Sequence, residues 1–187
     1  SFYFYTEKEI YDENGQIYGA KKISAVLKSR EATATKITYF KVNNYPLYLC
    51  VIIDLFSRKV IGYKVSKNQS THLVTSAFKH AFEERGTPNG LIFHSDRGGR
   101  YIAFTKLLRN SGGTTILFRF WKAGDNAFAE TFFATFKKEE AYRRTYSSEQ
   151  DYRKSVERYI EFYNEKRPHR SLAYKTPAHF EELFGKK

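Results

Sequence analysis

Residues 36–66, KITYFKVNNYPLYLCVIIDLFSRKVIGYKVS, contain three β-strand patterns in close succession. Ile37–Phe40 is a short strand, and Tyr48–Ile53 is a nearly continuous apolar run, typical of a strand buried on both faces. Lys59–Val65 alternates between two faces. Because the turn-forming stretches NNYP and DLFS separate these runs, the sequence predicts a three-stranded meander.

Downstream of the meander, helical and extended patterns alternate. Apolar residues recur at helical spacing after Ser70 or Thr71, either of which can cap a helix. The elements expected next are a helix over residues 70–82, a strand over 91–93, a helix over 104–108 and a strand over 114–118. A meander followed by helix, strand, helix, strand and helix is the order of the ribonuclease-H-like fold. The predicted class is therefore α/β, a mixed sheet flanked by helices.

Two helices complete the predicted fold. In the first, Phe128, Phe132 and Phe136 recur every four residues and are expected to face the core, which leaves Glu130 and Lys137 together on another face. The second begins at the capping sequence SSEQ, residues 147–150, and carries an apolar stripe. That stripe is Tyr152, Val156, Tyr159, Ile160 and Tyr163.

Composition limits the classes of function. A chain of 187 residues with 41% hydrophobic residues suits one domain with a proper core. The net charge of +12 is spread along the chain and favours a polyanionic partner such as DNA, although charge that serves only solubility is the alternative. Cys50 is the only cysteine, so no intramolecular disulfide forms, and we expect a buried, inert thiol. No apolar run approaches a membrane span and no signal peptide is visible, so a cytoplasmic setting is expected.

Residues 1–31 are a distinct opening segment. Two short helical patterns are interrupted by glycines, and the second carries Lys21 and Lys22 beside a narrow apolar stripe. A truncated helix-turn-helix that binds DNA is one interpretation, and a surface helical hairpin is the other. The predicted boundary leaves a core over residues 32–187, with a basic C-terminal tail.

Two carboxylates stand out as candidate metal ligands. Asp96 directly follows the predicted fourth strand, and Glu130 lies on the helix described above, with 33 residues between them. A carboxylate at a strand end and another on a distant helix can converge on a divalent cation. Two such cations can hold a phosphodiester for in-line displacement.

Several stretches of this chain match a known pattern. They are Ile17–Ile23 (IYGAKKI), Leu49–Gly62 (LCVIIDLFSRKVIG), His94–Gly98 (HSDRG), Asp125–Phe133 (DNAFAETFF) and Tyr163–Pro177 (YNEKRPHRSLAYKTP). In this order they resemble insertion-sequence transposases with a retroviral-integrase-like core, the DDE superfamily. The resemblance implies cleavage and strand transfer of DNA, transposon ends and target, by a homo-oligomer with two Mg²⁺ or Mn²⁺ ions.

The resemblance also assigns roles to residues, with one marked departure. It implies that Asp96 and Glu130 are the second and third catalytic metal ligands. In the family the first ligand is the aspartate of a short strand with a sequence like Asp-Ile-Thr-Tyr. In this chain the corresponding stretch begins with Lys36. An ammonium adds positive charge where dications belong, so we expect impaired catalysis. Lys36 could instead pair with Asp96 or Glu130 and take the place of the missing ion.

Other departures concern length. The spacing from Asp96 to Glu130 is shorter than in the family, and the stretch Ile116–Gly124 looks altered. The step near residues 30–34 is abrupt and suggests an internal deletion, which would remove part of the DNA-binding region.

Further residues are assigned with an alternative beside each. Asp54 is expected to have a turn or capping role, with substitute ligand as the alternative. His94 is expected to fill the strand end, and Glu139, the rival of Glu130, to be a surface residue. Lysine and arginine bind phosphate, so the candidates for DNA contact, beside Lys21 and Lys22, are Lys137, Arg167, His169 and Arg170.

Three functions remain in competition. The first is a transposase or integrase core with impaired catalysis. The second is a DNA-binding or regulatory transposase fragment without catalysis. The third, a nuclease acting on RNA–DNA hybrids with the same fold, is disfavoured by the stretches DNAFAETFF and YNEKRPHRSL.

Overall fold

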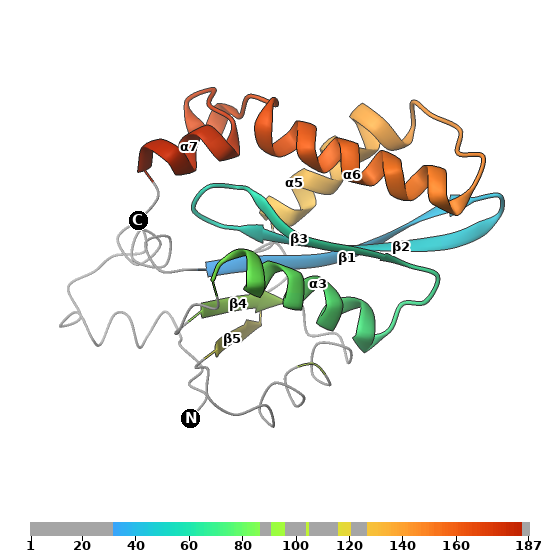
Figure 1. Ribbon diagram of the computed structural model, residues 1–187, viewed down its shortest axis with the longest axis horizontal. Coiled ribbons are helices and arrows are strands. Elements are labelled where there is room, and N and C mark those ends of the chain that lie inside the picture. Colours follow the sequence, from blue (N-terminus) through green and yellow to red (C-terminus); the bar gives the residue numbers. More distant parts are fainter. Residues whose placement is uncertain (1–31, 87–90, 96–103, 105–115, 121–126, 185–187) are drawn as a thin grey trace.

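The computed structural model describes residues 32–86, 91–95, 104, 116–120 and 127–184. Five strands form one sheet in the order β3-β2-β1-β4-β5 (Figure 1). The strands are β1 (Ala32–Val42), β2 (Tyr45–Asp54), β3 (Val60–Ser66), β4 (Leu91–Ser95) and β5 (Ile116–Phe120).

The predicted meander is confirmed. β1 pairs antiparallel with β2 from Thr33 opposite Asp54 to Val42 opposite Tyr45, and β2 pairs antiparallel with β3. Asn43 and Asn44 have φ of 48° and 66°, the left-handed backbone that a tight hairpin turn requires and that asparagine tolerates. The two asparagines thus fix the register of the whole β1–β2 ladder.

Strand β1 is much longer than the predicted Ile37–Phe40. The polar pattern of residues 32–36 hides the strand, yet Thr33 and Thr35 are buried between β2 and β4. Thr35 satisfies its hydroxyl by donating to the carbonyl of Val51 at 3.0 Å. The sheet therefore extends a strand that local propensity alone would end early.

The second half of the sheet is parallel. β1 pairs parallel with β4, and β4 with β5, so the sheet is mixed as predicted. β5 overlaps the predicted strand over 114–118, whose first two residues lie outside the described ones. Of the helix predicted over 104–108, only Phe104 lies among the described residues. It is fully buried, with its ring centroid 5.0 Å from that of Phe78.

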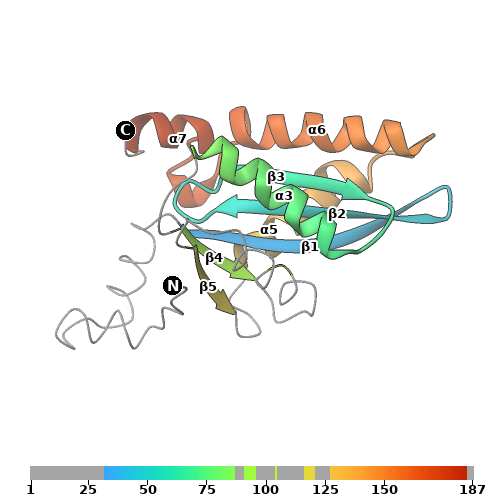
Figure 2. The same cartoon turned by 60° about the horizontal axis from the view of Figure 1, so that its bottom comes forward.

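Helices cover both faces of the sheet (Figure 2). α3 (Thr71–Glu84) confirms the helix predicted after Ser70 and packs on one face. α5 (Ala127–Phe136) and α6 (Glu149–Glu165) pack on the other. A π-helical turn, η1 (Lys137–Ala141), extends α5, and the chain ends with a 3₁₀ turn, η2 (Arg170–Leu172), and α7 (Pro177–Phe184).

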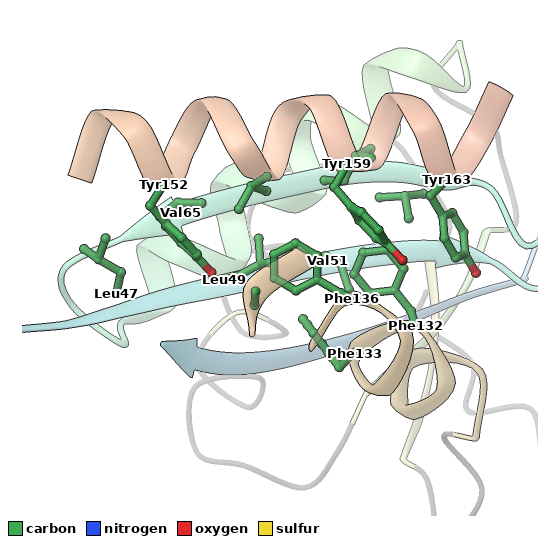
Figure 3. Close-up of a cluster of buried hydrophobic side chains, with 14 of the residues drawn as sticks. Leu47, Leu49, Val51, Val65, Phe132, Phe133, Phe136, Tyr152, Tyr159 and Tyr163 are labelled. Carbon is green, nitrogen blue, oxygen red and sulfur yellow. The ribbon is translucent and has the colours of Figure 1, made fainter. Parts of the chain in front are cut away.

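The larger core lies between β2 and the pair α5–α6 (Figure 3). β2 alternates strictly: Leu49 and Val51 face α5 and α6, whereas Cys50 and Ile52 face α3. The predicted buried thiol and the predicted apolar stripe of α6 are confirmed. Phe132 and Phe136 are fully buried as predicted. The prediction for the third phenylalanine of that series is wrong: Phe128 is only partly buried.

Side chains of α6 cover the outer edge of the sheet. The Asn164 side-chain amide accepts from the Val60 backbone N–H and donates to the Val60 carbonyl, both at 2.9 Å. Arg153 donates to the Val65 carbonyl at 2.7 Å. Because these groups occupy the hydrogen bonds that a further strand would use, they block edge-to-edge pairing along part of β3.

Gly62 on β3 is where α3 approaches the sheet most closely. A Cβ placed there would collide with the carbonyl oxygen of Ala77 and would lie 2.6 Å from the Cβ of Ala81. The helix backbone cannot move away without losing its buried contacts. Only glycine therefore allows this packing distance.

We expect Gly62→Ala to lower the free energy of unfolding by about 1–3 kcal/mol, the usual cost of overpacking a well-packed core. Chemical denaturation measures it. Lys64→Ala, on the same face of β3 but exposed, is the matched control and should change stability by less than about 0.5 kcal/mol. Equal stability of Gly62→Ala and the unmodified chain would contradict this packing.

Candidate active site

An ion pair joins the two candidate catalytic positions that the structure describes. The Lys36 ammonium on β1 donates to Glu130 Oε1 on α5 at 2.7 Å. The residues are 94 positions apart in sequence. Packing of α5 on β1 brings them together, because Phe40, four residues after Lys36, meets Phe136 edge to face at 5.4 Å. Of the two partners proposed for Lys36 from sequence, the structure gives Glu130.

The pair is open to solvent. The side chains of Lys36 and Glu130 are 35% and 50% exposed. An exposed pair of this kind contributes between about 0 and 1 kcal/mol to stability, because water screens the attraction. The pair therefore matters less for stability than for chemistry, because it determines which charged groups are present at the predicted catalytic position.

The described residues do not fit the metal site that the sequence resemblance implies. A lysine ammonium offers hydrogen-bond donors and no acceptor, and here it occupies an oxygen of Glu130. Within the described ranges, no group of three or more His, Cys, Asp or Glu side chains could hold a metal ion. The Lys36 ammonium offsets the negative charge with which Glu130 would attract a dication.

Asp96 lies outside the described residues, as do Lys21, Lys22 and the segment 1–31. Strand β4 ends at Ser95, its neighbour in the chain. His94 pairs with Ala34 in the parallel register of β1 and β4. From that pair the two strands run in the same direction. β1 continues to Lys36, and β4 ends at Ser95, directly before Asp96. The predicted ligand role of Asp96 stays a prediction.

Lys137 lies on the same side of α5 as Glu130, seven residues and about two helical turns further on. Its ammonium lies 5.8 Å from the centre of the Phe40 ring, a cation–π contact with the strand that carries Lys36. Glu130 and Lys137 therefore share the seam between α5 and β1, as the helical spacing predicts. The contact of Lys137 with DNA phosphate stays a prediction.

Glu139, predicted to be a surface residue, is only partly exposed, at 31% of its side chain, and is bound by other side chains. Arg167 binds it through two nitrogens, with distances of 2.9 and 2.9–3.1 Å, and the Tyr159 hydroxyl donates to it at 2.9 Å. Burial raises the pKa of the Glu139 carboxyl, but the hydrogen bonds from Arg167 and Tyr159 outweigh it, so the pKa lies below its ordinary value. The π-helical turn points Glu139 toward α6, which the regular helical spacing used in prediction could not show.

The two residues predicted to bind phosphate beside Arg170 are engaged inside the protein. Arg167 holds Glu139, and His169 is buried with its ring 4.5 Å from that of Tyr163. Burial and the neighbouring Arg167 guanidinium lower the pKa of His169, so it is neutral at pH 7 and offers no positive charge. Arg170 is exposed in η2. The predicted DNA contacts of these three residues stay predictions. Of the three, Arg170 is the one whose side chain is exposed to solvent.

Asp54 has the turn role that the sequence favoured. Its Oδ1 accepts from the backbone N–H groups of Phe56 and Ser57 at 2.8 and 2.9 Å. Its Oδ2 lies 3.2 Å from Arg85, which also binds Glu181 of α7. The carboxylate is thus fully used in joining β2, α3 and α7.

Arg58 was missed by sequence reasoning. Its guanidinium carbon lies 3.4 Å from the centre of the Phe128 ring, at the first turn of α5. Burial lowers the pKa of Arg58 to about 10. The partly buried Phe128 ring thus packs against Arg58, and this contact ties the β2–β3 turn to the helix that carries Glu130. An arginine in a surface turn gives no sequence signal of such a role.

Sequence comparisons identify relatives of this chain. Two family models, each described as integrase core domain, match residues 27–119 and 114–177. The transposase for insertion sequence element IS904 of Lactococcus lactis subsp. lactis is 34% identical over 149 residues, which cover 78% of this chain and 59% of the relative. The putative transposase InsK for IS150 of Escherichia coli is 32% identical, with 82% and 55% covered. The chain thus spans little more than half the length of these curated relatives.

Solved structures share the fold. The HTLV-2 integrase catalytic core domain in complex with magnesium superposes with a TM-score of 0.63 at 17% identity, covering 81% of this chain and 95% of that chain. The catalytic domain of Mos1 mariner transposase gives 0.57 at 12% identity, covering 97% and 89%. The ribonuclease-H-like architecture predicted from the order of elements is confirmed. No helix in the described part of the chain has the length and apolarity needed to cross a bilayer.

We expect Glu139→Gln to lower the free energy of unfolding at pH 7 by about 1–2 kcal/mol, because it weakens charged hydrogen bonds to Arg167 and Tyr159. A lowered pKa contributes stability above the ordinary value of 4.5 and loses it as the pH falls through the folded-state value. The difference between variant and unmodified chain should therefore vanish in acid. Denaturation curves from pH 7 to the acid range measure this.

Glu161→Gln, an exposed change on α6, is the control and should show no such pH dependence. A stability difference for Glu139→Gln that stays constant down the whole pH range would contradict the assignment.

Proposed function

Because the chain belongs to the integrase-core family of insertion-sequence transposases, we propose that it is a transposase core that binds DNA but is impaired in cleaving and joining it. The observation that carries this proposal is the ion pair between Lys36 and Glu130. It rests on the family resemblance for the roles of positions 36, 96 and 130.

Electrostatics supports the impairment. Like charges about 4 Å apart repel by roughly 4 kcal/mol per pair of unit charges at an effective dielectric near 20, and a dication doubles that term. Glu130 still attracts a metal ion, but Lys36 offsets that attraction, so we expect the affinity of this site for Mg²⁺ or Mn²⁺ to be strongly reduced. The proposed impairment follows from this reduced affinity.

DNA remains the proposed partner. The net charge of +12 and the lysine at position 137 beside the pair both favour phosphates. We also propose that the segment 1–31, with Lys21 and Lys22, is a helix-turn-helix-like DNA-binding unit before the core of residues 32–187. We also infer a homo-oligomer and a cytoplasmic setting, since strand transfer in this family is carried out by multimers acting on DNA in the cell.

A second candidate, a regulatory fragment without catalysis, is favoured by the same ion pair. A core that keeps its fold and DNA affinity but lacks a metal ligand could co-assemble with an intact relative and inhibit it. Co-expression with an active transposase of the family tests this: transposition should fall in proportion to the amount of this chain. Unchanged transposition would exclude the regulatory role.

We expect Lys36→Asp to create metal binding. The aspartate removes the repulsion and adds an oxygen ligand beside Glu130. Calorimetric titration with Mn²⁺ should show binding only in the variant, and Mg²⁺-dependent or Mn²⁺-dependent cleavage and joining of duplex DNA should appear with it.

Lys41→Asp, the same charge change at an exposed position of β1, is the matched control and should bind no metal. Metal-dependent cleavage by the unmodified chain would overturn the impairment and return Asp54 to consideration as a ligand. Metal binding without activity in Lys36→Asp would place the defect in Ile116–Gly124 or in the truncated segment.

We expect DNA binding itself to depend on salt but not on divalent metal. Affinity should fall about tenfold or more between roughly 50 and 200 mM salt, as two or more phosphate contacts require. Chelation by EDTA should leave it unchanged, because fixed lysines supply the charge. Fluorescence anisotropy with a generic duplex measures both. Absence of binding at low salt would overturn the proposed function.

A further inference from the structure

A cavity of about 500 Å³ opens between η1 and the C-terminal half of α6, away from the Lys36–Glu130 pair. Its lining carries three arginines, two glutamates and two aromatic residues. They are Glu139, Glu140, Arg143, Arg144, Arg158, Tyr159 and Phe162.

The carboxylates of this cavity are already occupied. Glu139 is bound by Arg167 and Tyr159. Glu140 is 13% exposed, pairs with Arg144 at 2.8 Å and accepts a hydrogen bond from Ser155. Counting Arg167, four guanidinium groups therefore meet two carboxylates, and the cavity keeps a positive surplus.

Two arginines carry that surplus. Arg143 is exposed and held in place, since its Nε donates to the Lys138 carbonyl at 3.1 Å. Arg158 is exposed and has no hydrogen-bond or ion-pair partner within the part of the chain that the structure describes. Guanidinium groups bind phosphate oxygens in pairs through their planar fork of donors, so these two are suited to a phosphodiester.

An aromatic wall completes the site. Phe162, one helical turn after Arg158 on α6, is 42% exposed. The ring centroid of Tyr159 lies 6.0 Å from that of Phe162, and Tyr159 packs between α6 and α5 (Figure 3). Aromatic surface next to guanidinium groups suits the sugar and base of a nucleotide better than a free inorganic anion.

The cavity is a separate site from the predicted catalytic seam. Lys137 faces the same way as Glu130, but Glu139 comes two residues later, about half a helical turn around the axis. DNA held in the cavity would therefore run over a different side of the α5–η1 helix. A core that handles transposon end and target needs more than one such contact.

We propose that this arginine cavity is a second DNA-binding site, in which Arg143 and Arg158 hold the phosphodiester backbone and Phe162 packs against the nucleotide. The proposal rests on the DNA-binding function proposed above. It adds a contact surface to which no role was assigned from the sequence.

The test is anisotropy with duplex DNA on the full 187-residue chain, comparing Arg143→Ala/Arg158→Ala with a charge-matched control. The control is Lys154→Ala/Lys166→Ala, two exposed residues of α6 and its end that do not line the cavity. We expect the arginine pair to lower affinity by roughly tenfold or more at about 100 mM salt and to reduce the salt slope by about two. The control should change affinity by less than about threefold.

Arg143→Lys/Arg158→Lys separates charge from geometry. It keeps the net charge but loses the paired donors, so we expect an intermediate loss of affinity and an unchanged thermal midpoint. Phe162→Ala should weaken binding without changing the salt slope, since it removes no charge.

Equal losses in the arginine pair and the lysine control would overturn the proposal, because they would reflect only the overall field of the protein. A change in oligomeric state by light scattering, with DNA affinity intact, would assign the cavity to a protein interface instead and also overturn it. If the unmodified chain binds no DNA at low salt, the proposed function itself has failed, and that outcome is distinct from either.

Discussion

The packing of α5 against β1 is the constraint on which the rest of the structure depends. Phe136 and Phe132 are fully buried, and the edge-to-face contact of Phe136 with Phe40 fixes the helix along the strand. Once α5 is fixed there, Glu130 must lie above Lys36 and Lys137 above Phe40. The core thus positions the seam, and the ion pair, being solvent-exposed, contributes little to holding it.

The π-helical turn that follows α5 changes the side of the helix on which the next side chains lie. One extra residue per turn rotates the chain after Lys137, so that Glu139 meets Tyr159 and Arg167 instead of solvent. This contact holds the segment after α6 against the helix. The same rotation leaves the following arginines at the mouth of a cavity, so one backbone irregularity separates the seam from the arginine site.

Much of the fold could be predicted, because buried strands and helices leave periodic patterns. Val51 and its neighbours in β2, and the tyrosine stripe of α6, are examples. Strand β1 was underestimated because its first residues are polar and are buried only by neighbours distant in sequence. α7 was not predicted, although Thr176 and Pro177 are a helix-start signal, and Thr176 accepts from the His179 N–H at 3.2 Å.

The candidate site shows the same division. Motif order pointed to positions 36 and 130, which the structure brings together, whereas their catalytic roles stay predictions. The partners of Glu139, Phe128 and His169 could not be predicted, since each depends on long-range contacts: a π-helical turn, a surface-turn arginine and a buried tyrosine ring. Sequence patterns report which face a residue occupies along one element, whereas pairing across elements is decided by packing.

A lysine at position 36 changes the chemistry of the seam while leaving its architecture intact. Its long side chain reaches from β1 to α5 and pairs with Glu130 at 2.7 Å, so the negative charge of Glu130 is balanced. A small neutral residue at position 36 would leave the Glu130 carboxylate unpaired. An unpaired carboxylate is costly only when it is buried, and Glu130 is half exposed. Stability therefore does not require the lysine. What the lysine adds is a positive charge on this seam, which under the proposed function favours phosphate without a metal ion. Under the proposed function, binding of DNA and chemistry on DNA are separable properties of one scaffold, and position 36 is the residue that separates them.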